Sequence, residues 1–101
     1  MTAEDPRLDV AVDIDGALVL EGEIDSYTSP ELTARLNADP TIEIVDLAAV
    51  TFIDSSGLRA LVQAHQARNE VGSSLQLRAP SAAVQRLLEI SGLAGYLDVS
   101  S

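Results

Sequence analysis

The chain has 101 residues, of which 47% are hydrophobic and only three are aromatic, so one domain with an aliphatic core is expected. Its 16 acidic residues outnumber six arginines, and the formal charge of −10 disfavours nucleic acid and anionic membranes, which bind cationic groups. Without cysteine, disulfides and thiolate metal sites are excluded. No apolar run approaches the roughly 20 residues of a membrane span and the start is acidic, so we expect a cytoplasmic protein. We also expect it to be monomeric when free.

The negative charge is concentrated in the first half of the chain. Residues 1–54 hold thirteen acidic residues and two arginines, a net charge of −11, whereas residues 55–101 hold three acidic residues and four arginines, a net charge of +1. A fold that keeps these stretches apart gives a polarised molecule. The simpler alternative is an acidic surface that only confers solubility.

The whole chain, residues 1–101, is expected to form a single domain, of which the polar residues 1–7 are flexible. Apolar residues alternate with others from Leu8 to Ile14, which predicts a half-buried strand, and Asp15-Gly16 predicts a turn into a second strand, Ala17 to Glu23. A two-residue turn would put the apolar residues of the two strands on opposite faces. A longer loop or a bulge near the turn would bring the apolar residues of both strands to the same face.

Asp13, Asp15 and Gly16 resemble part of a calcium-binding loop. The first and twelfth ligand positions of that loop would be Ala11 and Gly22, which cannot supply side-chain oxygens. We therefore expect no metal site here.

The segment after the second strand has the features of a helix start. Thr28 or Ser29 can cap the helix, and Pro30 suits its first turn. Glu31 lies three residues after Thr28, as in a capping box. The helix continues through the apolar pair Leu32 and Leu36 and is expected to end at Asp39-Pro40. A buried strand is predicted from Thr41 to Leu47, followed by a short connection over Ala48 to Thr51.

The second half alternates helices and strands. An amphipathic helix is predicted from Gly57 to Arg68, with Gly72 available as its C-terminal cap. A strand from Ser74 to Ala79, a helix capped by Ser81 and ending at Ser91-Gly92, and an edge strand from Tyr96 to Val99 follow. The order β-β-α-β-α-β-α-β predicts an α/β fold, a mixed sheet with an N-terminal antiparallel hairpin, covered by helices.

Few residues could support catalysis. The one histidine, His65, lies on the apolar side of its helix, where a packed imidazole is expected. The nucleophile-elbow, P-loop and dinucleotide-binding motifs are absent, and the chain has no lysine. The carboxylates Glu21, Glu23 and Asp25 are explained as exposed residues at a strand end. The sequence therefore predicts a protein that is not an enzyme and has no cofactor of its own.

The segment from Val50 to His65 is the most informative. An apolar approach leads into Asp54, Ser55 and Ser56 at the start of a helix, followed by Gly57. Asp54 or Ser55 can simply cap the helix. Alternatively a hydroxyl here is a phosphoacceptor, because a helix N-terminus accommodates a phosphate.

Three ordered motifs resemble those of the STAS domain family, and within it the anti-sigma factor antagonists of bacterial partner-switching systems. Leu20 to Leu32 is similar to the G-E-[LI]-D element and the helix after it. Val45 to Leu61 resembles D-L-x-x-V-x-F-[IM]-D-S-[ST]-G-L, and Leu75 to Leu93 resembles the C-terminal strand, proline turn and helix ending in S-G-L. The resemblance covers nearly the whole chain and implies a STAS-type fold.

By this resemblance, the unmodified protein binds a cognate anti-sigma factor, itself a serine kinase using ATP and Mg²⁺, and so releases a sigma factor. The phosphorylated residue corresponds to Ser55, with Ser56 as the less favoured acceptor, and a serine phosphatase reverses the modification. The nucleotide and metal belong to those partners. The implied switch and partner-binding residues are Asp25, Asp54, Ser55, Ser56, Gly57, Leu58 and Arg59.

Arg59 departs from the family pattern, in which a small residue is common at this position. A cation here can contact the partner or the phosphate, or it can be an ordinary solvated arginine. A STAS scaffold or accessory subunit of a signalling or transport complex is the alternative function. The intact Asp54–Leu58 motif favours the phosphoprotein switch.

Overall fold

The computed structural model describes residues 8–100, which form a five-stranded sheet with three helices. The strands lie side by side in chain order; β1 pairs antiparallel with β2, and the other neighbours are parallel. The predicted mixed sheet with an N-terminal hairpin is confirmed. The predicted flexibility concerns residues 1–7, which lie outside the described range. The elements are β1 (Leu8–Val12), β2 (Leu18–Ile24), α1 (Ser29–Ala38), β3 (Ile44–Ile53), α2 (Ser55–Glu70), β4 (Gln76–Arg78), α3 (Ala82–Ser91) and β5 (Asp98–Ser100).

The hairpin contains the longer loop that the apolar pattern required. Val12 pairs with Leu18 and Val10 with Leu20, so apolar residues of β1 and β2 are direct partners. The loop between them closes through a hydrogen bond from the Asp13 N–H to the Ala17 carbonyl, at 3.0 Å. The strand therefore ends at Val12, two residues earlier than predicted.

Strand β3 is longer than predicted. It continues from Ile44 to Ile53 through Ala48 to Thr51, which we had expected to be a connection. Its pairing with β2 persists there, with irregular register around Glu21 to Glu23. The register between β2 and β3 shifts beside Ala48, and pairing resumes at Ala49 opposite Glu21, so the segment is an irregularity within one strand and not a connection between elements.

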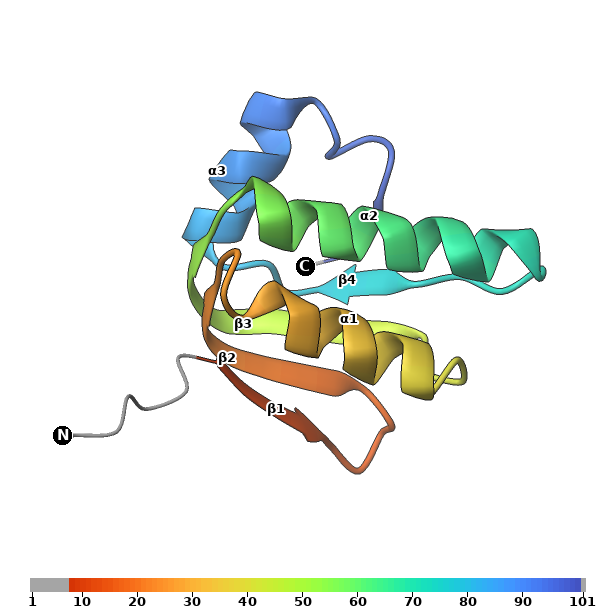
Figure 1. Cartoon of the computed structure of the whole chain (residues 1–101). Coiled ribbons are helices and arrows are strands. Elements are labelled where there is room, and N and C mark those ends of the chain that lie inside the picture. The colour runs from red at the N-terminus through yellow and green to blue at the C-terminus, as the bar shows by residue number, and fades with distance from the viewer. Residues whose placement is uncertain (1–7, 101) are drawn as a thin grey trace, which may run out of the picture.

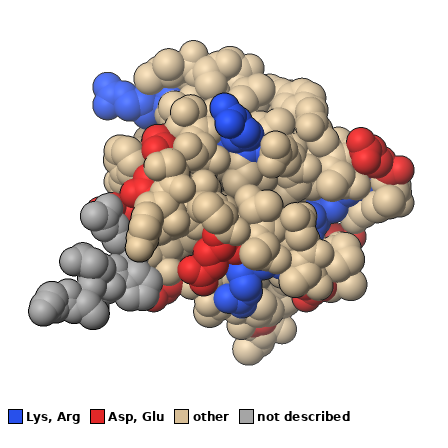
Figure 2. Space-filling view, viewed as in Figure 1, with Lys and Arg blue, Asp and Glu red and all other residues tan. Residues whose placement is uncertain are grey.

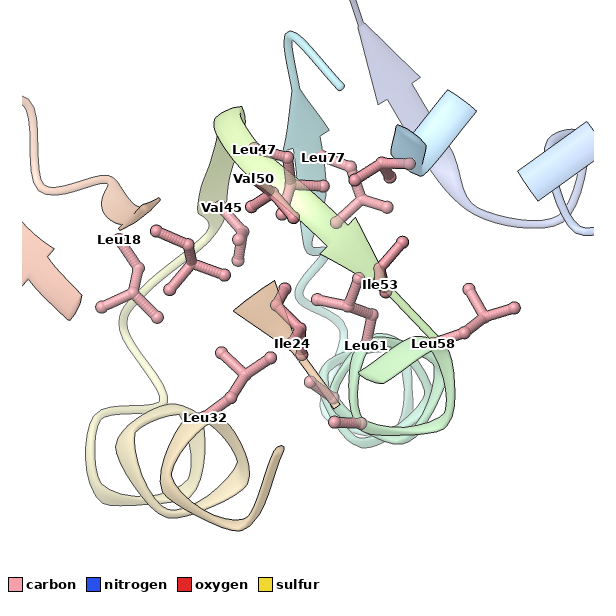
Figure 3. Close-up of a cluster of buried hydrophobic side chains, with 14 of the residues drawn as sticks. Leu18, Ile24, Leu32, Val45, Leu47, Val50, Ile53, Leu58, Leu61 and Leu77 are labelled. Carbon is pink, nitrogen blue, oxygen red and sulfur yellow. The ribbon is translucent and has the colours of Figure 1, made fainter. Parts of the chain in front are cut away.

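Helices α1 and α2 lie side by side across one face of the sheet, and α3 packs against β3 near the end from which α2 begins (Figure 1). Leu32 of α1 and Leu61 of α2 lie around Ile24 of β2 in the core (Figure 3). The core is aliphatic, as the composition indicated. Its fully buried large side chains are Leu18, Leu20, Ile24, Leu32, Leu36, Leu47, Leu61, Leu75, Leu77, Leu88, Val45 and Val50.

The helix ends agree with the sequence except at the start of α1. Ser81 accepts a hydrogen bond from the Val84 N–H, and Gly92 ends α3 in the left-handed conformation, as predicted. Thr28 precedes α1 but makes no side-chain cap, so the predicted capping box is wrong. Its hydroxyl instead donates to the Glu23 carbonyl at 2.8 Å, because the tight turn after β2 brings that carbonyl within reach.

Two arginines hold loops in place at the end of the sheet where β3 begins. Arg68, only 4% exposed, donates to the carbonyls of Ile42, Leu36 and Asp39 at 2.7, 3.1 and 3.1 Å and so fastens the end of α1 to α2. Arg78 bridges Asp46 and Asp13 at 2.8 and 3.0 Å. Backbone donation from Ala17 and the bond from Arg78 lower the pKa of Asp13 below its ordinary 3.8.

The strand order places the acidic and arginine-bearing halves of the chain on two sides of the sheet. Because the strands follow one another in sequence, the first half forms the β1–β2–α1 side and the second half forms the side with α2, β4, α3 and β5 (Figure 1). The two stretches meet along α1 and α2 and through the ion pairs of Arg78 with Asp13 and Asp46, so the charge polarity of the molecule stays a prediction. Within residues 8–100, no helix is both long and apolar enough to cross a membrane.

Candidate functional site at the ends of strands β2 and β3

The most informative segment of the sequence lies where two neighbouring parallel strands end. Ile24 and Ile53, the last residues of β2 and β3, are paired in register. The Asp54 N–H donates to the Ile24 carbonyl at 3.1 Å, which extends the pairing by one residue. Asp25 and Asp54, far apart in the sequence, therefore follow adjacent strand ends.

Asp54 is the cap of α2. One carboxylate oxygen, Oδ1, accepts hydrogen bonds from the backbone N–H groups of Ser56 and Gly57 at 2.9 and 3.2 Å. Of the two caps that the sequence allowed, Asp54 or Ser55, the structure has the first. Since an aspartate cap satisfies otherwise orphaned N–H groups of the first turn, Asp54 has a structural role whatever else it does.

Asp25 organises the turn that leads from β2 into α1. Its Oδ1 accepts from the N–H groups of Tyr27 and Thr28 at 2.9 and 3.0 Å, and its own N–H donates to the Thr28 hydroxyl at 2.9 Å. This is a short-range aspartate turn. Both acids at the strand ends thus fix backbone beside the start of a helix.

Gly57 allows α2 to begin against the end of β2. A Cβ atom built at this position would lie 2.5 Å from Cγ2 of Ile24 and 3.0 Å from the Ile24 carbonyl oxygen. Real Cβ atoms do not approach so closely, so any other residue would push the first turn away from the sheet. Gly57 lies within a helix, where other residues can adopt the same backbone conformation, so it is the close packing against Ile24 that requires a glycine.

The two adjacent serines have different surroundings. Ser55, the first residue of α2, is exposed. Ser56 is half-buried and lines a shallow depression of about 370 Å³ between α1 and α2, together with Ser26, Ser29 and Thr33. A protein kinase approaching from solvent therefore has freer access to Ser55 than to Ser56.

The remaining predicted residues divide between core and surface. Gly57 and Leu58 are buried, so they position the helix and offer little side chain to a partner. Arg59 is exposed on α2 and lines the same depression as Ser56. It lies four residues after Ser55, a spacing that puts two side chains on one side of a helix.

His65 is packed, as predicted, and lies well into α2. It is 7% exposed, its Nε2 lies 3.1 Å from the side-chain nitrogen of Asn69, and its ring meets Tyr96 edge-on at a centroid distance of 5.2 Å. Among residues 8–100 no group of three histidine, cysteine or carboxylate residues could hold a metal ion.

Sequence reasoning missed an apolar component of this end of the molecule. Phe52 of β3 and Ile90 of α3 are exposed and border one surface groove. The exposure of Ile90 could have been inferred from helical spacing, because it does not share the face of α3 that buries Val84 and Leu88. Its nearness to Phe52 could not, since it depends on how α3 packs.

Comparison with known proteins gives one family. The model of the family described as "Mlab, STAS domain" matches residues 9–99. The anti-sigma-B factor antagonist of Listeria monocytogenes is 31% identical over 88 residues, 83% of this chain and 77% of that protein. The protein of the same name from Staphylococcus aureus is 37% identical over 83 residues, 78% of this chain and 77% of the relative.

Solved structures agree with this result. An anti-sigma factor antagonist from Mycobacterium paratuberculosis is 28% identical with a TM-score of 0.76, over 98% of this chain and 89% of that one. The anti-sigma factor antagonist SpoIIAA in its unphosphorylated form superimposes with a TM-score of 0.71, over 93% of this chain and 88% of its own. At 18% identity the SpoIIAA match shows a shared fold.

Proposed function

The chain belongs to the STAS domain family and is similar to proteins named anti-sigma-B factor antagonist; on that premise we propose that it is an anti-sigma factor antagonist controlled by phosphorylation of Ser55. In its unmodified form it binds an anti-sigma factor, and a sigma factor is released. The anti-sigma factor is also the serine kinase, and a serine phosphatase restores the binding form. The protein acts in the cytoplasm and has no catalytic activity of its own.

The observation that carries this proposal is that Asp54 caps α2 while the adjacent Ser55 is exposed. Asp54 caps α2 through its carboxylate, so the helix start does not depend on the serine. The Ser55 hydroxyl is exposed at the first helical position. A phosphate can therefore be added without removing the contact that fixes the first turn.

Phosphorylation changes the electrostatics of this surface more than its shape. Phosphoserine adds about −1.5 to −2 charges at neutral pH. The N–H groups of Ser56 and Gly57 are already occupied by Asp54, so the phosphate lies beside a carboxylate and faces solvent. Docking would require desolvating that charge, which costs several kcal/mol, about a thousandfold in affinity.

The test is to incubate the protein with candidate anti-sigma factor kinases, ATP and Mg²⁺, and to map the modified residue by mass spectrometry. We expect one phosphate on Ser55, unchanged stoichiometry in Ser56→Ala and none in Ser55→Ala. Labelling that persists in Ser55→Ala would overturn the assignment of the residue. No labelling with any candidate would favour a STAS scaffold or accessory subunit instead.

A further inference from the structure

Arg59 lies one helical turn after Ser55 on the exposed side of α2. Ser55 is the first residue of this helix, and both side chains are exposed. Residues four apart on a helix have Cβ atoms about 5–6 Å from each other, and an acid four residues before its base is the favourable order. A phosphate on Ser55 would therefore lie within reach of the Arg59 guanidinium.

The guanidinium of Arg59 is free to make this contact. Among the described residues it has no hydrogen-bond or ion-pair partner, unlike those of Arg68 and Arg78. Arg59 lines the depression between α1 and α2, where no carboxylate is among the described lining residues. Figure 2 shows a basic side chain over α2 that is surrounded, on this face, by residues that are neither acidic nor basic. On the side of the depression, no acidic side chain therefore competes with a phosphate for this cation.

Most of the other charged side chains around Ser55 are acidic. The titratable groups on the surrounding elements are Glu23 in β2, Asp25 and Tyr27 in the turn after it, Glu31 in the first turn of α1, Asp54 at the start of α2, and Arg86 and Glu89 on α3. Carboxylates disfavour the second negative charge of a nearby phosphate, whose ordinary pKa in phosphoserine is about 6. Without a cation close by, the phosphate would therefore lose part of that charge near neutral pH.

Arg86 is the alternative cation at this end of the sheet and is less well placed than Arg59. It lines the groove between β3 and α3, on the other side of β3 from the depression. Glu89, which is also exposed, lies three residues after it on the same helix, a spacing that brings the two side chains together. Arg86 thus has an acidic neighbour on its own helix and no helical spacing to Ser55.

We propose that Arg59 is the counter-ion of the phosphate on Ser55 and holds it as a dianion. The inference rests on the proposed function, which supplies the phosphate, and adds how the modified state is stabilised. A guanidinium donates two parallel hydrogen bonds to phosphate oxygens, and the first turn of a helix favours negative charge. The attraction to Arg59 offsets the repulsion by Asp54, so modification delivers its full charge to the surface while the helix start stays intact.

The test follows the phosphorus-31 chemical shift of the phosphoserine as a function of pH. The protein carries phosphoserine encoded at position 55 during its synthesis, so no kinase is needed. Wild type, Arg59→Gln and Arg86→Gln are compared at low ionic strength, and circular dichroism checks that each is folded. The two variants are matched, because they remove the same charge from exposed arginines at the same end of the sheet.

We expect Arg59→Gln to raise the pKa of the phosphate by about 0.3 or more, and Arg86→Gln to raise it by less than about 0.1. An unchanged phosphate pKa in Arg59→Gln would overturn the inference. So would equal rises in the two variants, which would mean that only the overall charge of this end matters. Failure of every candidate kinase to label Ser55 would instead count against the proposed function, because the encoded phosphoserine does not depend on a kinase.

Discussion

The two ends of the sheet use arginine in opposite ways. At the end where β3 begins, Arg68 is buried against three carbonyls and Arg78 bridges two aspartates. At the end where β3 stops, Arg59 and Arg86 have no partner among the described residues, and the capping is done by aspartate. Arg68 and Arg78 therefore hold segments of the fold together at one end, whereas at the other end Arg59 and Arg86 make no such contact among the described residues.

Arginines of the same helix provide the largest contrast. Arg68→Met removes three hydrogen bonds from a charged donor and leaves the carbonyls of Leu36, Asp39 and Ile42 poorly satisfied, so we expect a loss of roughly 2–4 kcal/mol of unfolding free energy. Arg59→Met should change it by less than about 0.5 kcal/mol. Urea denaturation of both variants measures the difference; equal stabilities would show that the two arginines are not used differently.

Glycines provide the next contrast, at the end that carries Ser55. Gly57→Ala should lower stability by about 1–3 kcal/mol, because its Cβ would lie 2.5 Å from Ile24 Cγ2 and the helix start must shift. Gly95→Ala is the matched control, since a Cβ there meets nothing within 4 Å. Denaturation midpoints of the two variants test this. If Gly57→Ala proved as stable as Gly95→Ala, the close contact between β2 and α2 would be wrong.

The smallest expected effect is an acid dependence at the end where β3 begins. The folded-state pKa of Asp13 is lowered, first by the backbone bond from Ala17 and then by Arg78, so its contribution is present above pH 3.8 and is lost as the pH falls through the lowered pKa. Asp13→Asn should therefore flatten the decline of the melting temperature below that pH. An unchanged acid profile would mean that Asp13 does not stabilise the fold as an anion.

Much of this could be predicted from the sequence because the signals are local. The element order follows from alternation, helical spacing and turn residues, and the Asp54–Gly57 segment indicated both a cap and a phosphoacceptor. The apolar stripe of α2 reaches Arg68 three residues after His65, and that spacing was the available signal for a buried arginine. Its carbonyl partners lie 26 to 32 residues away and were not predictable.

Features that depend on packing between distant segments could not be read from the sequence. Ala48 and Ala49 have the sequence pattern of a connection, whereas in the structure they belong to β3, which pairs with β2 on both sides of a register shift. Thr28 has the pattern of a cap, yet its hydroxyl bonds to Glu23 because the preceding turn favours that contact. The groove between Phe52 and Ile90 exists only because α3 packs against β3.

The most direct test of the central claim compares two forms of the same protein, unmodified and phosphorylated stoichiometrically at Ser55. Their affinities for the anti-sigma factor kinase are measured by calorimetry and their melting curves by circular dichroism. We predict an affinity about a thousandfold lower for the phosphorylated form, with an unchanged melting curve. Equal affinities, or a loss of binding that accompanies unfolding, would contradict a switch that acts through surface charge on an intact fold.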